Sequence, residues 1–363
     1  MLTLRLTPIM VATLLTGCVE PLTASGEGEG EGEGEGEGEG EGEGEGEGEG
    51  EGEGEGEGEG EGEGEGEGEG EEGFVMPVRD VCGGTLGQPA NVTIVDGAVV
   101  EVSGIVASPT TPGLLWLHND SGDDAQLYAV ATDGRFLGTL VLPDVTAIDF
   151  EDLAAAPCPD GDGACLWVAD VGDNGNGRAA VAVYAVREPA VDTGAAFGTV
   201  DAGRVWHLPF TLEGGPVDVE GVVVLPDASA VVLFQKVNDG ARIHRLDAPF
   251  TEDVVAVATL RGTFDTPGTG QALRLVNGAD LHPSGTRLLL RTYQALFEAD
   301  LGDGLAVDGV TGSDFFEVLR PLEAQGEAVC FDEDGSGVWT VSEQVTVSGF
   351  TLPNPLHHAV CTP

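Results

Sequence analysis

Ser103-Gly-Ile-Val-Ala-Ser-Pro109 is the first of five stretches that repeat one pattern along this chain. The others are Phe150-Glu-Asp-Leu-Ala-Ala-Ala-Pro157, Val219-Glu-Gly-Val-Val-Val-Leu-Pro226, Asn277-Gly-Ala-Asp-Leu-His-Pro283 and Gly326-Glu-Ala-Val-Cys-Phe-Asp332. Each copy starts near small or acidic residues, continues through apolar residues and ends at Pro or Asp. The starts lie about 45–70 residues apart, the repeat length of a four-stranded propeller blade. The pattern therefore predicts an all-β chain folded as a β-propeller.

Short β-rich segments bounded by Gly, Asp or Pro follow each repeat. The first of these segments are 114–118, 166–169, 231–234, 288–291 and 338–341. Two further strand-like segments complete most units, and no long stretch has a helical period. We predict five four-stranded blades, with strand 91–100 completing the last blade beside the C-terminal strands. Six blades are the alternative, with the extra one in the longer second or last unit.

The first residues have the pattern of an export signal. A basic start precedes a short apolar run at 6–15 and then Leu15-Thr-Gly-Cys18. Such a run is too short to span a membrane and is typical of a signal peptide. The segment before the Cys resembles the lipobox of bacterial lipoproteins, which implies a signal peptide at 1–17 and a lipidated N-terminus at 18–25 with the lipid on Cys18. The alternative is an ordinary signal peptide with an incidental Cys.

The resemblance also implies a location. Val19 follows the Cys, whereas Asp is the usual inner-membrane retention signal of this family, so we expect display at the outer membrane or cell surface. Several acyl chains on one residue would give stable attachment to the membrane.

Residues 26–73 form a linker in which Glu and Gly alternate strictly from Gly26 to Gly70. This segment has no apolar residue to bury, so we predict that it is disordered. It carries 24 of the negative charges, and its removal from the net charge of −51 leaves −27 for the rest. A chain this acidic disfavours nucleic acid and anionic lipid headgroups as direct partners. Residues 74–363 are long enough for one large β-domain.

Five cysteines fall in this domain, and export permits disulfides. Cys158 and Cys165 flank a Pro-Asp-Gly-Asp-Gly turn and are the best predicted pair. Cys330 lies in an apolar segment, so we predict that it is a small buried hydrophobic residue. Because the count is odd, a second bridge of Cys361 with either Cys82 or Cys330 stays open.

The predicted topology gathers polar residues at one rim. In a blade, the first strand lines the channel and the second runs antiparallel to it, so the start of one and the end of the other share a rim. The residues at these positions form the predicted ligand rim: Asp120, Glu151, Asp152, Glu220, Lys236, Arg291, Glu327 and Glu343.

Two interpretations of this rim remain open. Its carboxylates could hold calcium while Lys236 and Arg291 face an anionic group of a ligand. Alternatively, a salt-bridge network closes the channel and pins the blades together. The loop Asp170-Val-Gly-Asp-Asn-Gly175 is the best single candidate for cation binding, with Asp170, Asp173 and Asn174 as possible calcium ligands.

Several motifs together resemble a family of exported bacterial propellers. The motifs are Ser103-Gly-Ile, His118-Asn-Asp-Ser-Gly122, Phe150-Glu-Asp-Leu, Ala169-Asp-Val-Gly-Asp-Asn174 with Arg178, Val219-Glu-Gly, Leu288-Leu-Leu-Arg-Thr-Tyr293 and Gln325-Gly-Glu-Ala with Ser342-Glu343. That family is distantly similar to phytase-like and esterase-like propellers. The resemblance implies a propeller whose rim carboxylates bind calcium. This chain departs from the phytase-like pattern because it has few Lys and Arg to hold a polyphosphate.

Two functional hypotheses follow. The first is a displayed lipoprotein whose propeller binds or scaffolds an unidentified ligand or protein without catalysis. The second is a calcium-dependent hydrolase of phosphoesters or carboxylesters acting at the rim. The sequence favours the first, and the catalytic residues of the second are unknown.

Overall fold

Five inner strands stand side by side around the centre of the molecule. The computed structural model describes residues 85–86, 90–93, 98–238, 240–267, 274–302, 304–318, 320–323, 325–347, 350–352 and 354–362. Each inner strand lies next to the following one, and the last lies next to the first, so the ring is closed. The inner strands are β3 (Val102–Ala107), β7 (Phe150–Pro157), β12 (Val219–Val224), β16 (Val276–Leu281) and β20 (Gly326–Phe331).

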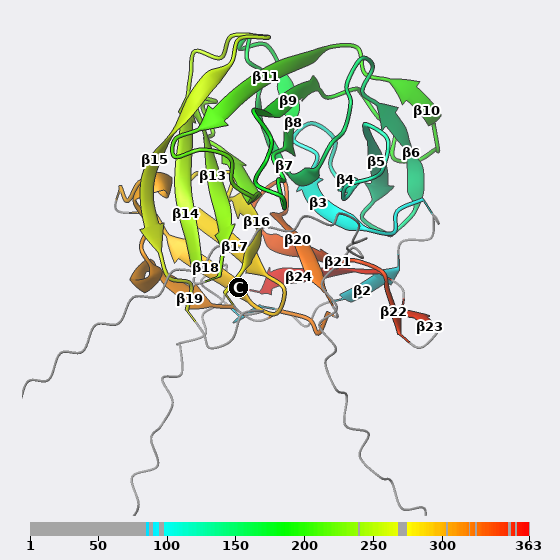
Figure 1. Cartoon of the computed structure of the whole chain (residues 1–363). Helices are drawn as coiled ribbons and strands as arrows, with labels where there is room; N and C mark the ends of the chain where they lie inside the picture. Colours follow the sequence, from blue (N-terminus) through cyan, green and yellow to red (C-terminus); the bar gives the residue numbers. More distant parts are fainter. Residues whose placement is uncertain are drawn as a thin grey trace, which may run out of the picture. The chain divides into compact units, whose positions relative to one another are not determined.

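Each inner strand begins an antiparallel blade of four strands (Figure 1). The second strands are β4 (Leu114–Asn119), β8 (Ala164–Asp170), β13 (Ala230–Val237), β17 (Arg287–Thr292) and β21 (Gly337–Ser342). The third are β5 (Gln126–Ala131), β9 (Val181–Arg187), β14 (Gly240–Asp247), β18 (Leu296–Asp300) and β24 (Pro355–Thr362). The fourth are β6 (Phe136–Val141), β11 (Val205–Leu212), β15 (Ala256–Phe264), β19 (Phe315–Glu317) and β2 (Ala90–Thr93). The β-propeller prediction is confirmed, and the described strands form five blades.

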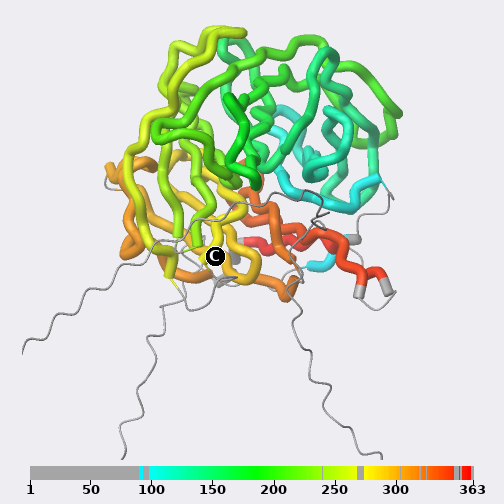
Figure 2. The backbone as a smooth tube through the Cα atoms, viewed as in Figure 1, coloured from blue at the N-terminus to red at the C-terminus, as the bar shows by residue number. Residues whose placement is uncertain are grey.

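The last blade combines both ends of the domain. β2 pairs with β24, and the short β1 (Thr85–Leu86) pairs with the other end of β24. Figure 2 shows this N-terminal segment beside the C-terminal one. The prediction that an N-terminal strand completes the last blade is therefore confirmed for Ala90–Thr93.

Two further pairings join neighbouring blades at the outer edge. The added strand β10 (Gly198–Asp201) runs parallel to β6, and β11 runs parallel to β15. The remaining elements are the hairpin of β22 (Val345–Val347) with β23 (Phe350–Leu352) and the 3-10 turns η2 (Val307–Gly309) and η3 (Gly312–Asp314). No helix in the described part is long and apolar enough to cross a membrane.

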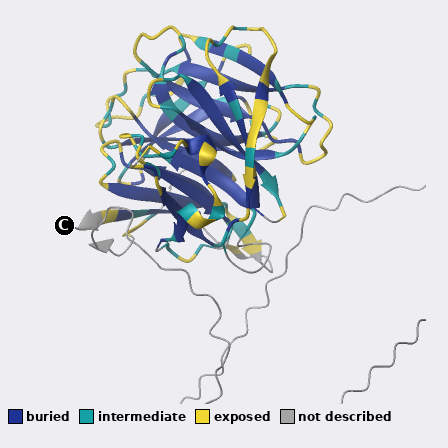
Figure 3. Ribbon diagram, turned by 90° about the vertical axis from the view of Figure 1, so that its left-hand side faces the viewer, coloured by how far each residue is buried: buried dark blue, intermediate teal, exposed yellow. Residues whose placement is uncertain are grey.

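The core lies between the blades, where apolar faces of adjacent sheets pack together. Figure 3 shows the buried strands inside the molecule and the exposed residues mainly in the connecting loops. Cys158 and Cys165 form a disulfide across the turn before β8, and Cys330 is a free, buried thiol. The segments predicted to be a signal peptide and a linker, together with Cys18, Cys82 and the side chain of Cys361, lie outside the described residues.

Asp152 joins three inner strands inside the channel. Its Oδ1 accepts the N–H of Leu153 on β7 at 2.9 Å, and its Oδ2 accepts those of Val222 on β12 at 2.7 Å and Ala279 on β16 at 3.1 Å. Burial raises the pKa of Asp152 well above its ordinary value despite these bonds. Asp280 on β16 makes the same kind of contact with the next inner strand, since its Oδ2 accepts the N–H of Phe331 on β20 at 2.7 Å. These carboxyl groups fasten neighbouring blades to one another.

Replacing Asp152 with Ala should destabilise the ring strongly. The change leaves three buried N–H groups without an acceptor, at about 1–3 kcal/mol each, so we expect a loss of at least about 3 kcal/mol in the free energy of unfolding. Asp152→Asn keeps one acceptor oxygen and should lose less. Urea denaturation measures both, and equal losses for the two variants would contradict this role.

Candidate functional site

All five inner strands carry a β-bulge at the same position. The register with the second strand shifts at the second residue of the inner strand, and that residue has no partner in the ladder. A bulge bends the strand and re-aims the extra side chain, which here is polar in every blade. The five bulge residues are Ser103, Glu151, Glu220, Asn277 and Glu327, and all are buried.

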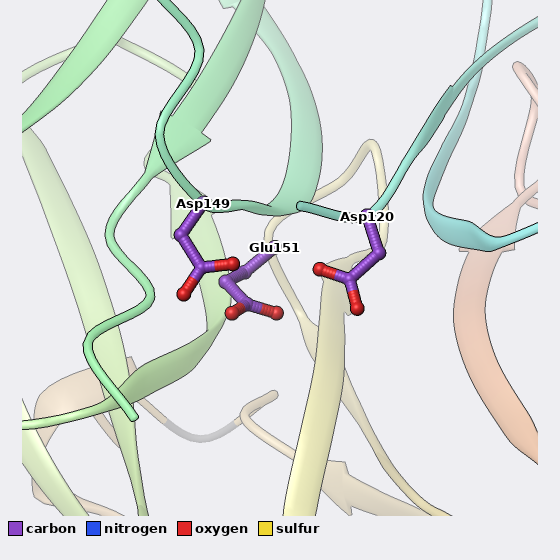
Figure 4. Close-up of side chains that lie close together, drawn as sticks. All are labelled: Asp120, Asp149 and Glu151. Atoms are coloured by element: carbon purple, nitrogen blue, oxygen red, sulfur yellow. The ribbon is translucent and has the colours of Figure 1, made fainter. Parts of the chain in front are cut away.

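Five carboxylates from the first three blades converge at this end of the channel. We call Asp120, Asp149, Glu151, Asp218 and Glu220 the mouth cluster. It consists of two triads, Asp120–Asp149–Glu151 and Glu151–Asp218–Glu220, and within each triad one oxygen from every residue lies within 4.8 Å of the others. Figure 4 shows the first triad, with Glu151 between Asp120 and Asp149. Glu151 belongs to both triads.

Glu151 is the central member, and no described residue of opposite charge pairs with it. Its side chain is 3% exposed, and within the described part of the chain no hydrogen bond or ion pair reaches its carboxylate. Burial raises the pKa of Glu151 well above its ordinary value, and the charges of Glu220, Asp120 and Asp149 raise it further. A buried carboxylate surrounded by like charges needs a proton or a cation.

Gly172 lets the backbone approach the first triad closely. A Cβ atom at this position would lie 2.1 Å from Oε1 of Glu151 and 2.5 Å from Cγ of Asp149. Both distances are well below van der Waals contact, so any side chain here would displace the carboxylates. The loop after β8 therefore helps to set the position of Glu151.

Lys236 is the only lysine in the sequence, and it lies at the second triad. Its Nζ is 2.5 Å from Oε1 of Glu220 and 5.4 Å from the ring centre of Tyr293. Burial alone would lower the pKa of Lys236, but Glu220 and Tyr293 outweigh it and raise the pKa above its ordinary value. Burial raises the pKa of Glu220 to about 7, although Lys236 opposes the shift.

Glu327 and Glu343 lie on the side of the fifth blade and are hydrogen-bonded. Glu327 Oε2 accepts the Asn277 side-chain amide at 2.6 Å, and Gln325 donates to Glu327 at 3.2 Å and to Glu343 at 2.6 Å. Burial raises the pKa of Glu327 well above its ordinary value and that of Glu343 to about 7. Unlike Glu151, these two carboxylates have neutral partners.

The loop predicted as a calcium site is satisfied by its own groups. Asp170 forms an ion pair with Arg178 at 2.8 Å, and Asp173 accepts the N–H groups of Gly177 at 2.8 Å and Arg178 at 2.9 Å. Asn174 is exposed. The carboxylates of Asp170 and Asp173 are thus engaged by Arg178 and by backbone N–H groups, and calcium binding by this loop with Asn174 stays a prediction.

Arg291 and Asp152 also differ from their expected places at the rim. Arg291 is fully buried, and its Nη2 is paired with Glu323, whose side chain is fully buried as well. Asp152 lies in the channel and accepts hydrogen bonds from the backbone N–H groups described above. Each therefore has a carboxylate or backbone groups of this chain as partners. Asp149 and Asp218 were not among the predicted rim residues, and they stand two residues before the bulge residues Glu151 and Glu220.

The solved structures that are similar to this chain share little of its sequence. No protein family matches the sequence, and no curated protein matches it either. Among solved structures, U3-55K is 12% identical with a TM-score of 0.38, covering 75% of this chain and 98% of its own. The RRP9 WD40 repeats are 13% identical with a TM-score of 0.39, covering 77% and 100%. Kuenenia stuttgartiensis hydrazine synthase is 14% identical with a TM-score of 0.35, covering 74% and 98%.

Without divalent cations, the domain should lose stability as the pH rises. Glu220 and Glu343, with pKa values of about 7, and Asp149, with a value of about 6, keep protons in the folded state that unfolded carboxyls lose near pH 4. Each group therefore destabilises the fold progressively between about pH 4 and its folded pKa. We expect a lower melting temperature at pH 7.5 than at pH 5 in chelator.

The variant Glu343→Gln distinguishes the effect of buried carboxyl groups on the melting temperature from the effect of net charge. It should melt higher than the wild type at pH 7.5, with a much smaller difference at pH 5. Glu333→Gln removes an exposed carboxylate in the turn between β20 and β21 and serves as the control. Equal shifts for the two variants would show that net charge, not the mouth, sets the pH dependence.

Proposed function

We propose that this chain is a binding or scaffolding propeller that holds a calcium ion in the mouth cluster, with Asp120, Asp149 and Glu151 as the ligands. The observation that carries the proposal is the buried carboxylate of Glu151, which has like charges on both sides and no hydrogen bond or ion pair with any residue that the structure describes. A cation at this point would satisfy Glu151 and relieve the repulsion from its neighbours.

Calcium fits the chemistry of these donors. The ligands are oxygens from carboxylates, which hard cations prefer, and calcium accepts six to eight of them in flexible geometry. Three carboxylates supply only part of that number. The remaining positions would be open to water or to oxygen atoms of a ligand, so the ion could link the propeller to a partner at the channel mouth.

The alternative of a purely structural salt-bridge network explains only part of the rim. It accounts for Lys236 with Glu220 and for Arg178 with Asp170. It does not account for Glu151, which has no such partner in the described part of the chain. The hydrolase hypothesis requires Lys236 and Arg291 to bind an anionic group of the substrate. Each of them is instead paired with a carboxylate of this chain, which disfavours that hypothesis.

The proposal extends to the place where the propeller acts. The lipobox-like segment ending at Cys18 supports a lipid anchor, and the Glu-Gly linker would hold the domain away from the membrane. Detection of acyl chains on Cys18 by mass spectrometry tests the anchor. An unmodified Cys18 in the membrane fraction of the native host would contradict it.

Calcium should raise the melting temperature of the wild type, and Glu151→Gln should abolish the rise. Glutamine keeps the shape of the side chain but removes the central charge, so the variant should also be more stable than the wild type in chelator at pH 7.5. Differential scanning calorimetry with and without calcium measures both effects, with Glu333→Gln as control. An unchanged melting temperature of the wild type in calcium would contradict the proposed site.

Gly172→Ala tests the site without removing a charge. The new methyl group would push Glu151 and Asp149 apart, so we expect calcium affinity to fall by tenfold or more. Gly175→Ala makes the same change in the same loop, where a Cβ would meet no atom within 4 Å, and should bind as the wild type does. Equal affinity of the two variants in calorimetric titration would place the ion elsewhere.

A further inference from the structure

The two triads of the mouth cluster have equivalent carboxylates but different surroundings. The first combines Glu151 with Asp120 and Asp149, the second combines it with Asp218 and Glu220, and the spacing of the oxygens suits a metal ion in both. Among the described residues, a cation of the chain forms an ion pair only with the second triad, where the ammonium group of Lys236 contacts Glu220, whereas Arg178 acts on Asp149 of the first triad through its charge without an ion pair. No lysine or arginine forms an ion pair with Asp120, Asp149 or Glu151 in the described part of the chain.

We infer that Lys236 is the resident cation of the Glu151–Asp218–Glu220 triad and restricts the mouth to a single divalent ion at Asp120–Asp149–Glu151. This inference rests on the proposed function. The ammonium group occupies Oε1 of Glu220, one of the oxygens that a second metal ion would need. It would also repel a divalent ion placed a few ångströms away.

Lys236 is well held in this position. Its side chain is 17% exposed and that of Glu220 is 6% exposed, so water screens the pair only weakly. Tyr293 packs against the ammonium group from the next blade. Asp218 is fixed independently, because its Oδ1 accepts the N–H of Asp173 at 2.8 Å. The position of Asp218 in the second triad therefore does not depend on Lys236.

Lys236→Met should convert the mouth into a site for two calcium ions that share Glu151. Methionine keeps most of the length of the side chain without its charge. Equilibrium dialysis of the full chain should give one calcium ion for the wild type and two for Lys236→Met. The background from the acidic linker is measured with Glu151→Gln, which removes the shared ligand of both triads. Arg135→Gln, an exposed change of equal charge, should bind one ion.

The number of bound calcium ions distinguishes the proposed calcium site from the proposed role of Lys236. One ion in both the wild type and Lys236→Met would overturn the inference while leaving the proposed site intact. Two ions in the wild type would also overturn it. No calcium above background in the wild type would refute the proposed function itself.

A second measurement needs no substitution at Lys236. Because this is the only lysine, amine-reactive labelling followed by mass spectrometry reports its side chain selectively. Calcium at the first triad leaves the contact of Lys236 with Glu220 in place, so we expect its labelling rate to stay within about twofold. A large increase on adding calcium would mean that the metal displaces Lys236 from Glu220, which would overturn the inference even if Lys236→Met did not fold.

Discussion

The β-bulge at the second residue of each inner strand is the constraint on which the channel mouth depends. It interrupts the ladder at one level around the ring and places a polar residue there in every blade. Two of these residues hold adjacent blades together, since Ser103 donates to the carbonyl of Glu151 and Asn277 to that of Gly326. The other three are glutamates, so the feature that closes the ring also concentrates negative charge at one end.

The buried carboxyl groups around the channel differ in the hydrogen bonds that they accept. Asp152 and Asp280 are buried, as Glu151 is, but backbone N–H groups of neighbouring inner strands donate hydrogen bonds to them. Such bonds favour the charged form and partly offset the desolvation that raises the pKa. Glu151 receives no such donor and has four acids nearby. This contrast distinguishes carboxyl groups that connect neighbouring inner strands from Glu151, which we propose binds a cation.

The repeat and the antiparallel order of strands were sufficient to predict the blades and to bring Glu151, Glu220 and Lys236 to one end of the channel. They could not predict the roles of Asp170 and Arg291, because these depend on loop residues: Arg178 folds back on Asp170, and Glu323 reaches Arg291 from the segment before β20. Asp149 and Asp218 were missed for the same reason. They lie just outside the strands, where periodicity carries no information about direction.

The choice of lysine at the mouth is informative in a chain with thirteen arginines. The guanidinium group of arginine is flat and suits paired oxygens, as in its buried contacts with Asp170 and Glu323. An ammonium group is compact and concentrates its charge at one point, which makes it the closest side-chain equivalent of a metal ion. A compact charge suits carboxylates whose oxygens lie within 4.8 Å of one another, as those of the second triad do. The first triad has the same spacing of oxygens, and no lysine or arginine of the described residues forms an ion pair with it.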